Sequence, residues 1–220
     1  MGTNSNGDSA NTINLLRHAG NGDQDAVAAL FARHQSRLEQ MVRLRMDRRL
    51  QGRIDASDVL QETYLEAARR VAEFAREPGT SVYLWLRVLT AQKLVDLTRQ
   101  HLGAKMRSVG QEISLYRGAL PRASSILLAE HLLGRFTSPS LAVIRAETQL
   151  RVQEALNTMD SVDREVLALR HFELLTNGEV AQVLGLSKAA ASNRYVRALK
   201  RLKVILSAVP APVLRRPDRP

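Results

Sequence analysis

Residues 179–203 read EVAQVLGLSKAAASNRYVRALKRLK, and their pattern decides how the C-terminal part of the chain folds. The spacing of the apolar residues predicts two short helices joined by a tight turn at Gly185, where a left-handed backbone would favour glycine. Ser187 is well placed to cap the second helix. One apolar stripe follows this second helix at spacings of three and four residues, and its members are Ala191, Tyr195, Ala198, Leu202 and Ile205.

The other faces of this second helix are basic. No acidic residue lies between Lys188 and Lys203, so the helix does not neutralise itself through pairs four residues apart. A helix–turn–helix whose second helix is basic outside and apolar inside fits the DNA major groove. A solvated surface helix is the alternative interpretation. The small Ala181 and Gly185 suit the close approach of two helices and favour DNA binding.

The composition indicates a polyanionic partner. The 220 residues carry a formal charge of +10, which most simply points to nucleic acid. A membrane surface is the competing partner, but the basic residues are spread over amphipathic helices and form no terminal anchor. The chain has no cysteine, which excludes disulfides and thiolate zinc sites. A polar start and the lack of a membrane-length apolar run predict a cytoplasmic protein without membrane insertion.

Breaks in the helical pattern divide the chain into parts. We expect an all-α fold of two small helical domains joined by a linker, with disorder in residues 1–11 and in the proline- and arginine-rich tail. In the second domain, a helix capped by Asp160 or Ser161 should bury apolar residues up to Leu174. The expected boundaries are 11–107 for the first domain, 108–140 for the linker with a short helix at 126–133, 141–208 for the second domain and 209–220 for the tail.

Two helices of the first domain carry distinctive side chains. Asp55 and Asp58 resemble an N-terminal capping pair, and Asp58, Gln61 and Glu62 share the exposed face near the start of their helix. Capping and solubility account for this acidic face when it is taken alone. The next helix begins near Tyr83 and Trp85. A tryptophan among leucines usually lies in the core, whereas aromatics beside a basic face can stack on unpaired bases, and for Tyr83 both interpretations stay open.

Two separate blocks resemble one family. DASDVLQETYLEAARRVAEF (residues 55–74), followed by WLRVLTAQKLVDLTRQ (residues 85–100), resembles region 2 of the RNA polymerase sigma-70 family, in its extracytoplasmic-function (ECF) group. ALNTMDSVDREVLALRHFELLTNGEVAQVLGLSKAAASNRYVRALKRLK (residues 155–203) resembles region 4 of the same group. The order and the separation of the two blocks match the family as well.

The resemblance implies an ECF-type sigma factor, which binds core RNA polymerase and directs promoter-specific transcription initiation at −10 and −35 elements. It implies contact with the clamp helices of the largest polymerase subunit by Asp55, Asp58, Gln61 and Glu62. It implies binding of the −10 element by the loop at 77–82 and by Tyr83, Trp85, Lys93, Asp96 and Arg99. It implies binding of the −35 element by Lys188, Ser192, Asn193, Arg194, Arg197, Lys200 and Arg201.

The family also bears on partners and cofactors. ECF factors are often held by an anti-sigma factor, and the sequence identifies none for this chain. No cofactor, metal or catalytic residue is implied. The recognition helix opens with three alanines at 189–191, which offer few hydrogen-bonding groups, so the promoter sequence is left open.

Two other classes of protein compete with a sigma factor. A helix–turn–helix regulator that never binds polymerase would explain residues 179–203 but not the block from 55 to 107. An enzyme, such as a helical nuclease with a DNA-binding tail, would need a cluster of catalytic groups. The five histidines are scattered, and no G-x4-G-K-[ST] phosphate loop occurs.

Overall fold

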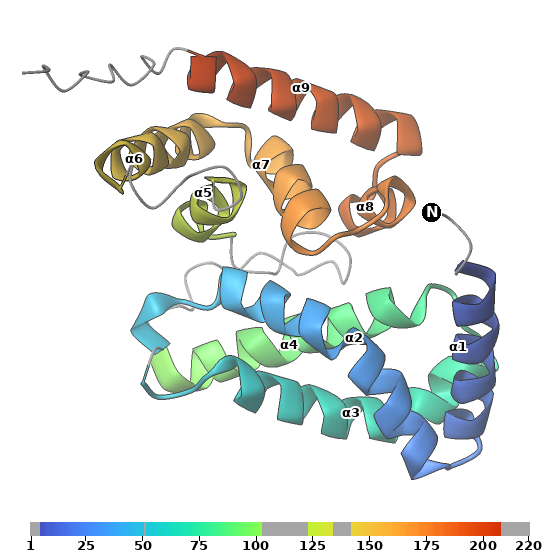
Figure 1. The fold of residues 1–220 in the computed structure, drawn as a ribbon. Helices are drawn as coiled ribbons and strands as arrows, with labels where there is room; N and C mark the ends of the chain where they lie inside the picture. Colours follow the sequence, from blue (N-terminus) through green and yellow to red (C-terminus); the bar gives the residue numbers. More distant parts are fainter. Residues whose placement is uncertain (1–4, 51, 103–122, 134–141, 208–220) are drawn as a thin grey trace, which may run out of the picture. The chain divides into compact units, whose positions relative to one another are not determined.

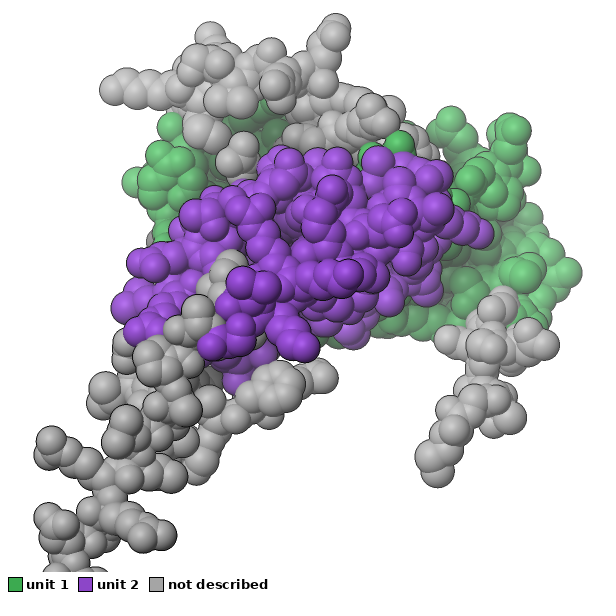
Figure 2. Space-filling view, turned by 90° about the horizontal axis from the view of Figure 1, so that it is seen from above, with its two compact units in different colours: residues 1–122, 182–185 green, residues 123–181, 186–220 purple. Residues whose placement is uncertain are grey.

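The structure is a computed structural model that describes residues 5–50, 52–102, 123–133 and 142–207. Within these ranges every regular element is a helix, so the predicted all-α fold is confirmed. The chain divides into two compact units, one made of residues 1–122 with 182–185, and one made of residues 123–181 and 186–220 (Figure 2).

The first unit is a bundle of long helices (Figure 1). Helix α1 packs against α2 and α3, and α3 also packs against α2 and α4. Leu38, Met41, Leu86 and Leu94 are among the fully buried side chains of its core. The bounds are Ser5–Gly20 for α1, Gln24–Arg45 for α2, Arg48–Leu50 for the 3-10 turn η1, Ala56–Arg76 for α3 and Val82–Leu102 for α4.

Helix α1 begins earlier than the sequence pattern predicts. Disorder was expected for residues 1–11, and this expectation is wrong for residues 5–11, which are helical. The C-terminal part of α1 is anchored by Leu15, Leu16 and Ala19, which pack on a core cluster shared with α2 and α3. Thr12 Oγ1 also accepts a 2.8 Å hydrogen bond from Arg33 Nη1. Once these contacts nucleate the helix, adding further turns toward the N-terminus costs little.

The second unit contains the predicted helix–turn–helix, except for residues 182–185 at the end of its first helix and in its turn. Helix α5 packs against α6, and α9 packs against both α6 and α7. The bounds are Ser125–Leu133 for α5, Ala142–Thr158 for α6, Ser161–Leu167 for α7, Ala168–Phe172 for the π-helical turn η4, Asn177–Leu184 for α8 and Lys188–Ser207 for α9.

Helix α5 lies within the stretch predicted as a linker. The short helix expected at 126–133 is confirmed, but its contacts with α6 and η4 make it part of the second unit. Buried Leu128 and Ala129 explain why this helix is held in the unit. The other predicted linker residues, 108–122 and 134–140, and the predicted tail at 209–220 lie outside the described residues.

A π-helical turn changes the register after α7. The Glu173 N–H donates to the carbonyl oxygen of Ala168 at 3.1 Å, five residues back, where an α-helix would bond four residues back. The extra residue rotates the following segment. Leu174 has a φ of 55° and is 60% exposed, whereas Leu175 is fully buried. The expectation that Leu174 packs inward is therefore wrong, and Leu175 takes that place.

In the ranges that the structure describes, none of the helices combines the length and the apolar character needed to span a bilayer.

A close contact between α1 and α3 at Gly20 generates a stability prediction. A Cβ added to Gly20 would lie 2.6 Å from the Cβ of Ala75, so Gly20→Ala must push the two helices apart. We expect the free energy of unfolding to fall by about 1–2 kcal/mol, measured by urea unfolding of the full chain. Gly20→Ala combined with Ala75→Gly should restore it, and Gly79→Ala, in an open loop, is the control. Equal effects of Gly20→Ala and Gly79→Ala would contradict the close contact.

Candidate nucleic-acid and polymerase interfaces

The turn of the helix–turn–helix is held by local hydrogen bonds. Gly185 adopts a φ of 60°, and the next N–H, that of Leu186, donates to the Ala181 carbonyl at 2.8 Å. Ser187 Oγ accepts the Ala190 N–H at 3.1 Å and caps α9 as predicted. Asn177 Nδ2 donates to the Lys188 carbonyl at 2.8 Å and ties the start of α8 to the start of α9. These bonds set the position of α9 relative to α8.

Helix α9 presents a buried stripe and an outer face. Ala191, Ala198 and Leu202 are buried and Tyr195 is half-buried, which confirms the predicted stripe at these four positions. The side chain of Ile205 is outside the described part. Six of the seven residues predicted to bind the −35 element are exposed, namely Lys188, Ser192, Asn193, Arg197, Lys200 and Arg201.

The seventh, Arg194, is held by two carboxylates. Its Nη1 lies 2.9 Å from Asp163 Oδ1 and 3.1 Å from Asp160 Oδ1, and its side chain is 29% exposed. Arg197 Nε lies 3.2 Å from the other oxygen of Asp163, whose side chain is 6% exposed. A carboxylate withdrawn this far from water is costly unless charged donors surround it. We call these four residues the Asp163 clamp; it joins the start of α7 to the middle of α9.

The start of α7 reinforces the clamp. Asp160 is the N-cap of α7, and its Oδ1 accepts the N–H groups of Val162 and Asp163 at 3.0 and 3.3 Å. Its pKa is lowered, chiefly by the hydrogen bond from the Asp163 N–H and also by Arg194. Asp160 therefore stays ionised and available to the guanidinium group. The predicted capping role of Asp160 is confirmed.

A histidine lies under the recognition helix. His171 Nε2 is 3.2 Å from the hydroxyl oxygen of Tyr195 on α9, and the His171 carbonyl is 3.1 Å from Nε2 of His131 on α5. Because a carbonyl oxygen can only accept, Nε2 of His131 carries the proton and donates it to the His171 carbonyl. Burial lowers the pKa of His171, and nearby Arg170 and His131 lower it further. His171 is therefore neutral near pH 7 and links three elements of the unit.

In the first unit, the acidic start of α3 is a complete capping box. Asp55 Oδ1 accepts the N–H groups of Ser57 and Asp58 at 2.7 and 3.1 Å, while the Asp55 N–H donates to Asp58 Oδ2 at 2.8 Å. The pKa of Asp55 is lowered, chiefly by a hydrogen bond from the Ser57 hydroxyl. The predicted capping pair is confirmed. Gln61 and Glu62 are exposed one turn further on.

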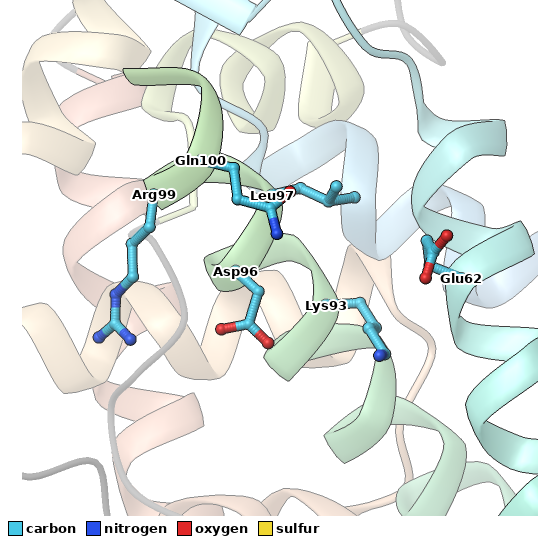
Figure 3. A pocket seen from close by; sticks show the side chains of 6 residues that line it. All are labelled: Glu62, Lys93, Asp96, Leu97, Arg99 and Gln100. Carbon is cyan, nitrogen blue, oxygen red and sulfur yellow. The ribbon is translucent and has the colours of Figure 1, made fainter. Parts of the chain in front are cut away.

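A polar pocket of about 410 Å³ lies between α3 and α4 (Figure 3). Figure 3 shows Glu62 on α3, and Lys93, Asp96 and Arg99 projecting from α4, with Lys93 nearest to Glu62 and Arg99 on the side away from it. The structure thus brings together three residues predicted for the −10 element and one predicted for polymerase. Lys93 Nζ also lies 3.3 Å from Glu66 Oε2, a neighbour that sequence reasoning missed.

The two aromatic residues of α4 have structural positions. Tyr83 is 2% exposed, and its ring packs under the Arg37 guanidinium at 3.6 Å, so it is a core residue and no longer a candidate contact. Half-buried Trp85 stacks on Phe74 with the ring centroids 4.4 Å apart and the planes 5° apart. This stack joins the end of α3 to the start of α4 across the loop at 77–81. The core interpretation of Trp85 is supported.

An apolar groove of about 430 Å³ opens beside the exposed edge of α3, and sequence reasoning missed it. Gln61 lines it next to Leu65, which is half exposed, and Gln35 of α2 closes the other side. Single exposed leucines are common on protein surfaces, but a leucine that borders an apolar groove can pack against a partner. The remaining lining residues are Phe31, Ser57, Leu60 and Tyr64.

Within the described ranges, no group of three or more histidine, aspartate or glutamate side chains is placed to hold a metal ion.

The two units match one family. Residues 30–102 match the model for Sigma-70 region 2, and residues 149–202 match the model for Sigma-70, region 4. The RNA polymerase sigma factor CarQ of Myxococcus xanthus is 26% identical over 88% of this chain and 97% of its own length. The ECF RNA polymerase sigma factor SigK of Mycobacterium sp. (strain KMS) is 28% identical over 86% of this chain and 87% of its own.

A third relative has a solved structure. The RNA polymerase sigma factor CnrH of Cupriavidus metallidurans is 29% identical over 88% of this chain and 93% of its own length. The structure of CnrH in complex with the cytosolic domain of CnrY matches 90% of this chain and 98% of that chain, with a TM-score of 0.53 and 25% identity.

These matches, together with the helix–turn–helix and the helical first unit, show that the chain belongs to the sigma-70 family of RNA polymerase sigma factors. Within this family it is an ECF sigma factor, a transcription initiation factor. The function predicted from the sequence is confirmed, and a regulator that never binds polymerase is not favoured.

The Asp163 clamp predicts unequal effects of two arginine substitutions. Arg194→Ala removes the most buried partner of Asp163, so we expect a loss of about 2–3 kcal/mol in the free energy of unfolding. Arg197 is 62% exposed, and Arg197→Ala should cost less than about 1 kcal/mol. Urea unfolding of the full chain measures both. Asp163→Asn should largely abolish the difference between the two variants, and equal effects in the wild-type background would contradict the clamp.

The environment of His171 predicts a pH dependence. The unfolded chain protonates His171 at its ordinary pKa of about 6.5, while the folded chain protonates it only at lower pH. The unfolded state therefore takes up the proton first, and stability falls as the pH drops from about 7.5 to about 5.5. His171→Gln should lose less stability than the wild type over this interval in urea unfolding. Parallel losses would show that His171 contributes nothing to the pH dependence.

Proposed function

We propose that this sigma factor binds core polymerase and the −10 element through α3 and α4, and the −35 element through the outer face of α9. The main support is the recognition helix α9. It has no acidic residue from Lys188 to Lys203, and the Asp163 clamp holds it so that its outer face is exposed to solvent. A helix of this kind meets DNA phosphates and base edges without repulsion. The chain acts by binding and carries out no catalysis, in the cytoplasm where polymerase works.

The polymerase surface is the exposed edge of α3. Gln61 and Glu62 offer an amide and a carboxylate to the clamp helices, and the adjoining groove at Leu65 offers apolar area. An interface with a polar edge around an apolar centre is typical of specific association. Asp55 and Asp58 act indirectly, because their carboxylates are engaged in starting α3. They position the binding surface.

The −10 surface is the pocket of Figure 3 together with the loop at 77–81. Arg99 supplies positive charge for the backbone, and Lys93 and Asp96 supply donors and an acceptor for a base. Unpairing a base costs free energy, which a protein pocket offsets by binding the base. Trp85 supports this surface from within, because its stack on Phe74 fixes the ends of the loop.

An inhibitory protein partner is also part of the proposal. CnrH was solved in complex with the cytosolic domain of CnrY. We propose that this chain has a partner of the same kind, an anti-sigma factor that covers its polymerase-binding surface.

The direct test is capture of core RNA polymerase by the purified full chain, followed by run-off transcription on a pool of genomic fragments. The proposal expects capture and new, sequence-selective start sites. Binding to duplex DNA without any capture of core polymerase would instead support a plain helix–turn–helix regulator.

The polymerase surface generates a residue prediction. Gln61→Ala with Glu62→Ala leaves the capping box intact and removes both polar groups of the exposed edge. We expect capture of core polymerase to weaken about tenfold or more, measured by titration of labelled chain, with duplex DNA binding unchanged. Glu73→Ala, at another exposed glutamate three turns along the same helix, is the matched control. An equal effect of Glu73→Ala would place the surface elsewhere.

A further inference from the structure

Four residues form a single outer stripe on the recognition helix. Ala189, Asn193, Val196 and Lys200 follow one another at spacings of four, three and four residues, so they share one face of α9. This face is opposite the buried stripe of Ala191 and its companions. All four side chains are exposed, and Val196 is 45% exposed although it is apolar. We call these four residues the outer stripe.

The arginines of α9 are directed away from the outer stripe. Arg194 and Arg197 are bound by Asp163, and Arg201 Nη2 donates to the Thr158 carbonyl at 3.3 Å. All three therefore lie on the flank of α9 that faces α6 and α7. Arginine and lysine are the usual readers of guanine in the major groove. On this flank the arginines are away from the outer stripe, which is the face of α9 that would meet base edges.

The lysines do not fill that place either, and Lys203, which is exposed, lies in the C-terminal half of α9 and far from its first turns. Lys188 lies at the first position of α9, and its Cε comes within 3.6 Å of a Cβ built on Gly178, so its side chain runs along the start of α8. Lys200 belongs to the outer stripe but lies three turns further along, whereas base edges are met by the first turns of a recognition helix. Lys200 therefore suits a phosphate.

In the first turns of α9 the outer stripe offers one amide, that of Asn193, and the methyl groups of Ala189 and Val196, with the exposed hydroxyl of Ser192 beside them. Asparagine pairs bidentately with N6 and N7 of adenine, and alanine and valine methyl groups pack against the 5-methyl group of thymine. Asn193 and Val196 are separated by about 4.5 Å along the helix axis. This distance is close to the rise of about 3.4 Å between base pairs. The two side chains can therefore meet neighbouring A·T pairs.

Building on the proposed function, we infer that Asn193 and Val196 are specificity-determining residues that select adjacent A·T pairs in the −35 element, Asn193 through adenine and Val196 through a thymine methyl group. Ala189 extends the apolar contact toward the start of α9. Guanine is disfavoured under the outer stripe, because Arg194, Arg197 and Arg201 are bound on the flank of α9.

The test uses polymerase holoenzyme assembled with the full chain on a promoter found by run-off transcription. Each thymine of the −35 element is replaced in turn by deoxyuridine, which lacks the methyl group. At one position we expect initiation to fall about fourfold, the equivalent of one buried methyl group at ~0.8 kcal/mol and tenfold per 1.4 kcal/mol. Val196→Ala should lose this sensitivity. Val204→Ala, at the other exposed valine of α9, should keep it.

A parallel series tests Asn193. Replacing one adenine by 7-deazaadenine, which lacks the N7 acceptor, should weaken wild-type initiation about tenfold and should leave Asn193→Ala unaffected. Lys200→Ala should weaken initiation equally at every −35 sequence, because a phosphate contact carries no base preference. That uniform loss is the internal control for a change in specificity.

Two outcomes overturn the inference in distinguishable ways. If initiation stays selective but Val196→Ala and Asn193→Ala respond to the modified bases as the wild type does, or if G·C pairs are preferred under the outer stripe, only the inference fails. If the chain captures no core polymerase or initiates without any −35 dependence, the proposed function fails as well.

Discussion

Asp163 lies at the contact between α7 and α9, with Arg194 at 2.9 Å and Arg197 at 3.2 Å from its two oxygens. The carboxylate is nearly buried, so it cannot rely on water and depends on these two guanidinium groups. The arginines are attached to the recognition helix, and the carboxylate is attached to a helix capped by its neighbour Asp160. The rotation of α9 about its own axis is therefore set by charge as well as by the packing of its alanines. Which side chains face DNA follows from that rotation.

The first unit depends on a comparable device at the start of α3. The capping box of Asp55 and Asp58 fixes where the helix begins, and the exposed edge at Gln61 and Glu62 follows one turn later. At the other end, the stack of Phe74 on Trp85 fixes where the chain turns into α4. Helix α3 is thus held at both ends. Its middle then presents one wall of the polar pocket and one wall of the apolar groove.

Much of this arrangement could be predicted from the sequence, because it depends on local rules. Helix caps at Asp55, Asp160 and Ser187 and the glycine turn at Gly185 need only the residues around them. The buried stripe of α9 follows from helical periodicity. Whatever depends on contacts between distant segments was missed. No local pattern indicates that Arg194 pairs with a residue 31 positions away, or that α5 packs on α6.

Two further positions, Leu174 and Tyr83, needed the structure for different reasons. The π-helical turn after α7 places Leu175 in the core instead of Leu174. A prediction that continues the α-helical repeat along the sequence does not include the extra residue of this turn, so it assigns the wrong leucine to the core. The tyrosine at 83 carries a polar group and stands beside basic residues, so its sequence context fits a surface contact. In the structure the Tyr83 ring is buried under the guanidinium group of Arg37, so Tyr83 is a core residue, and this contact joins α2 to α4.

An experimental structure of the holoenzyme on promoter DNA would show whether the Asp163 clamp keeps the arginines of α9 away from the bases. We expect Arg194 to remain within hydrogen-bond distance of Asp163, with Asn193 and Val196 at base edges in the major groove of the −35 element. Arg194 released from Asp163 and bound to a guanine edge would show that the clamp does not keep this arginine from the bases.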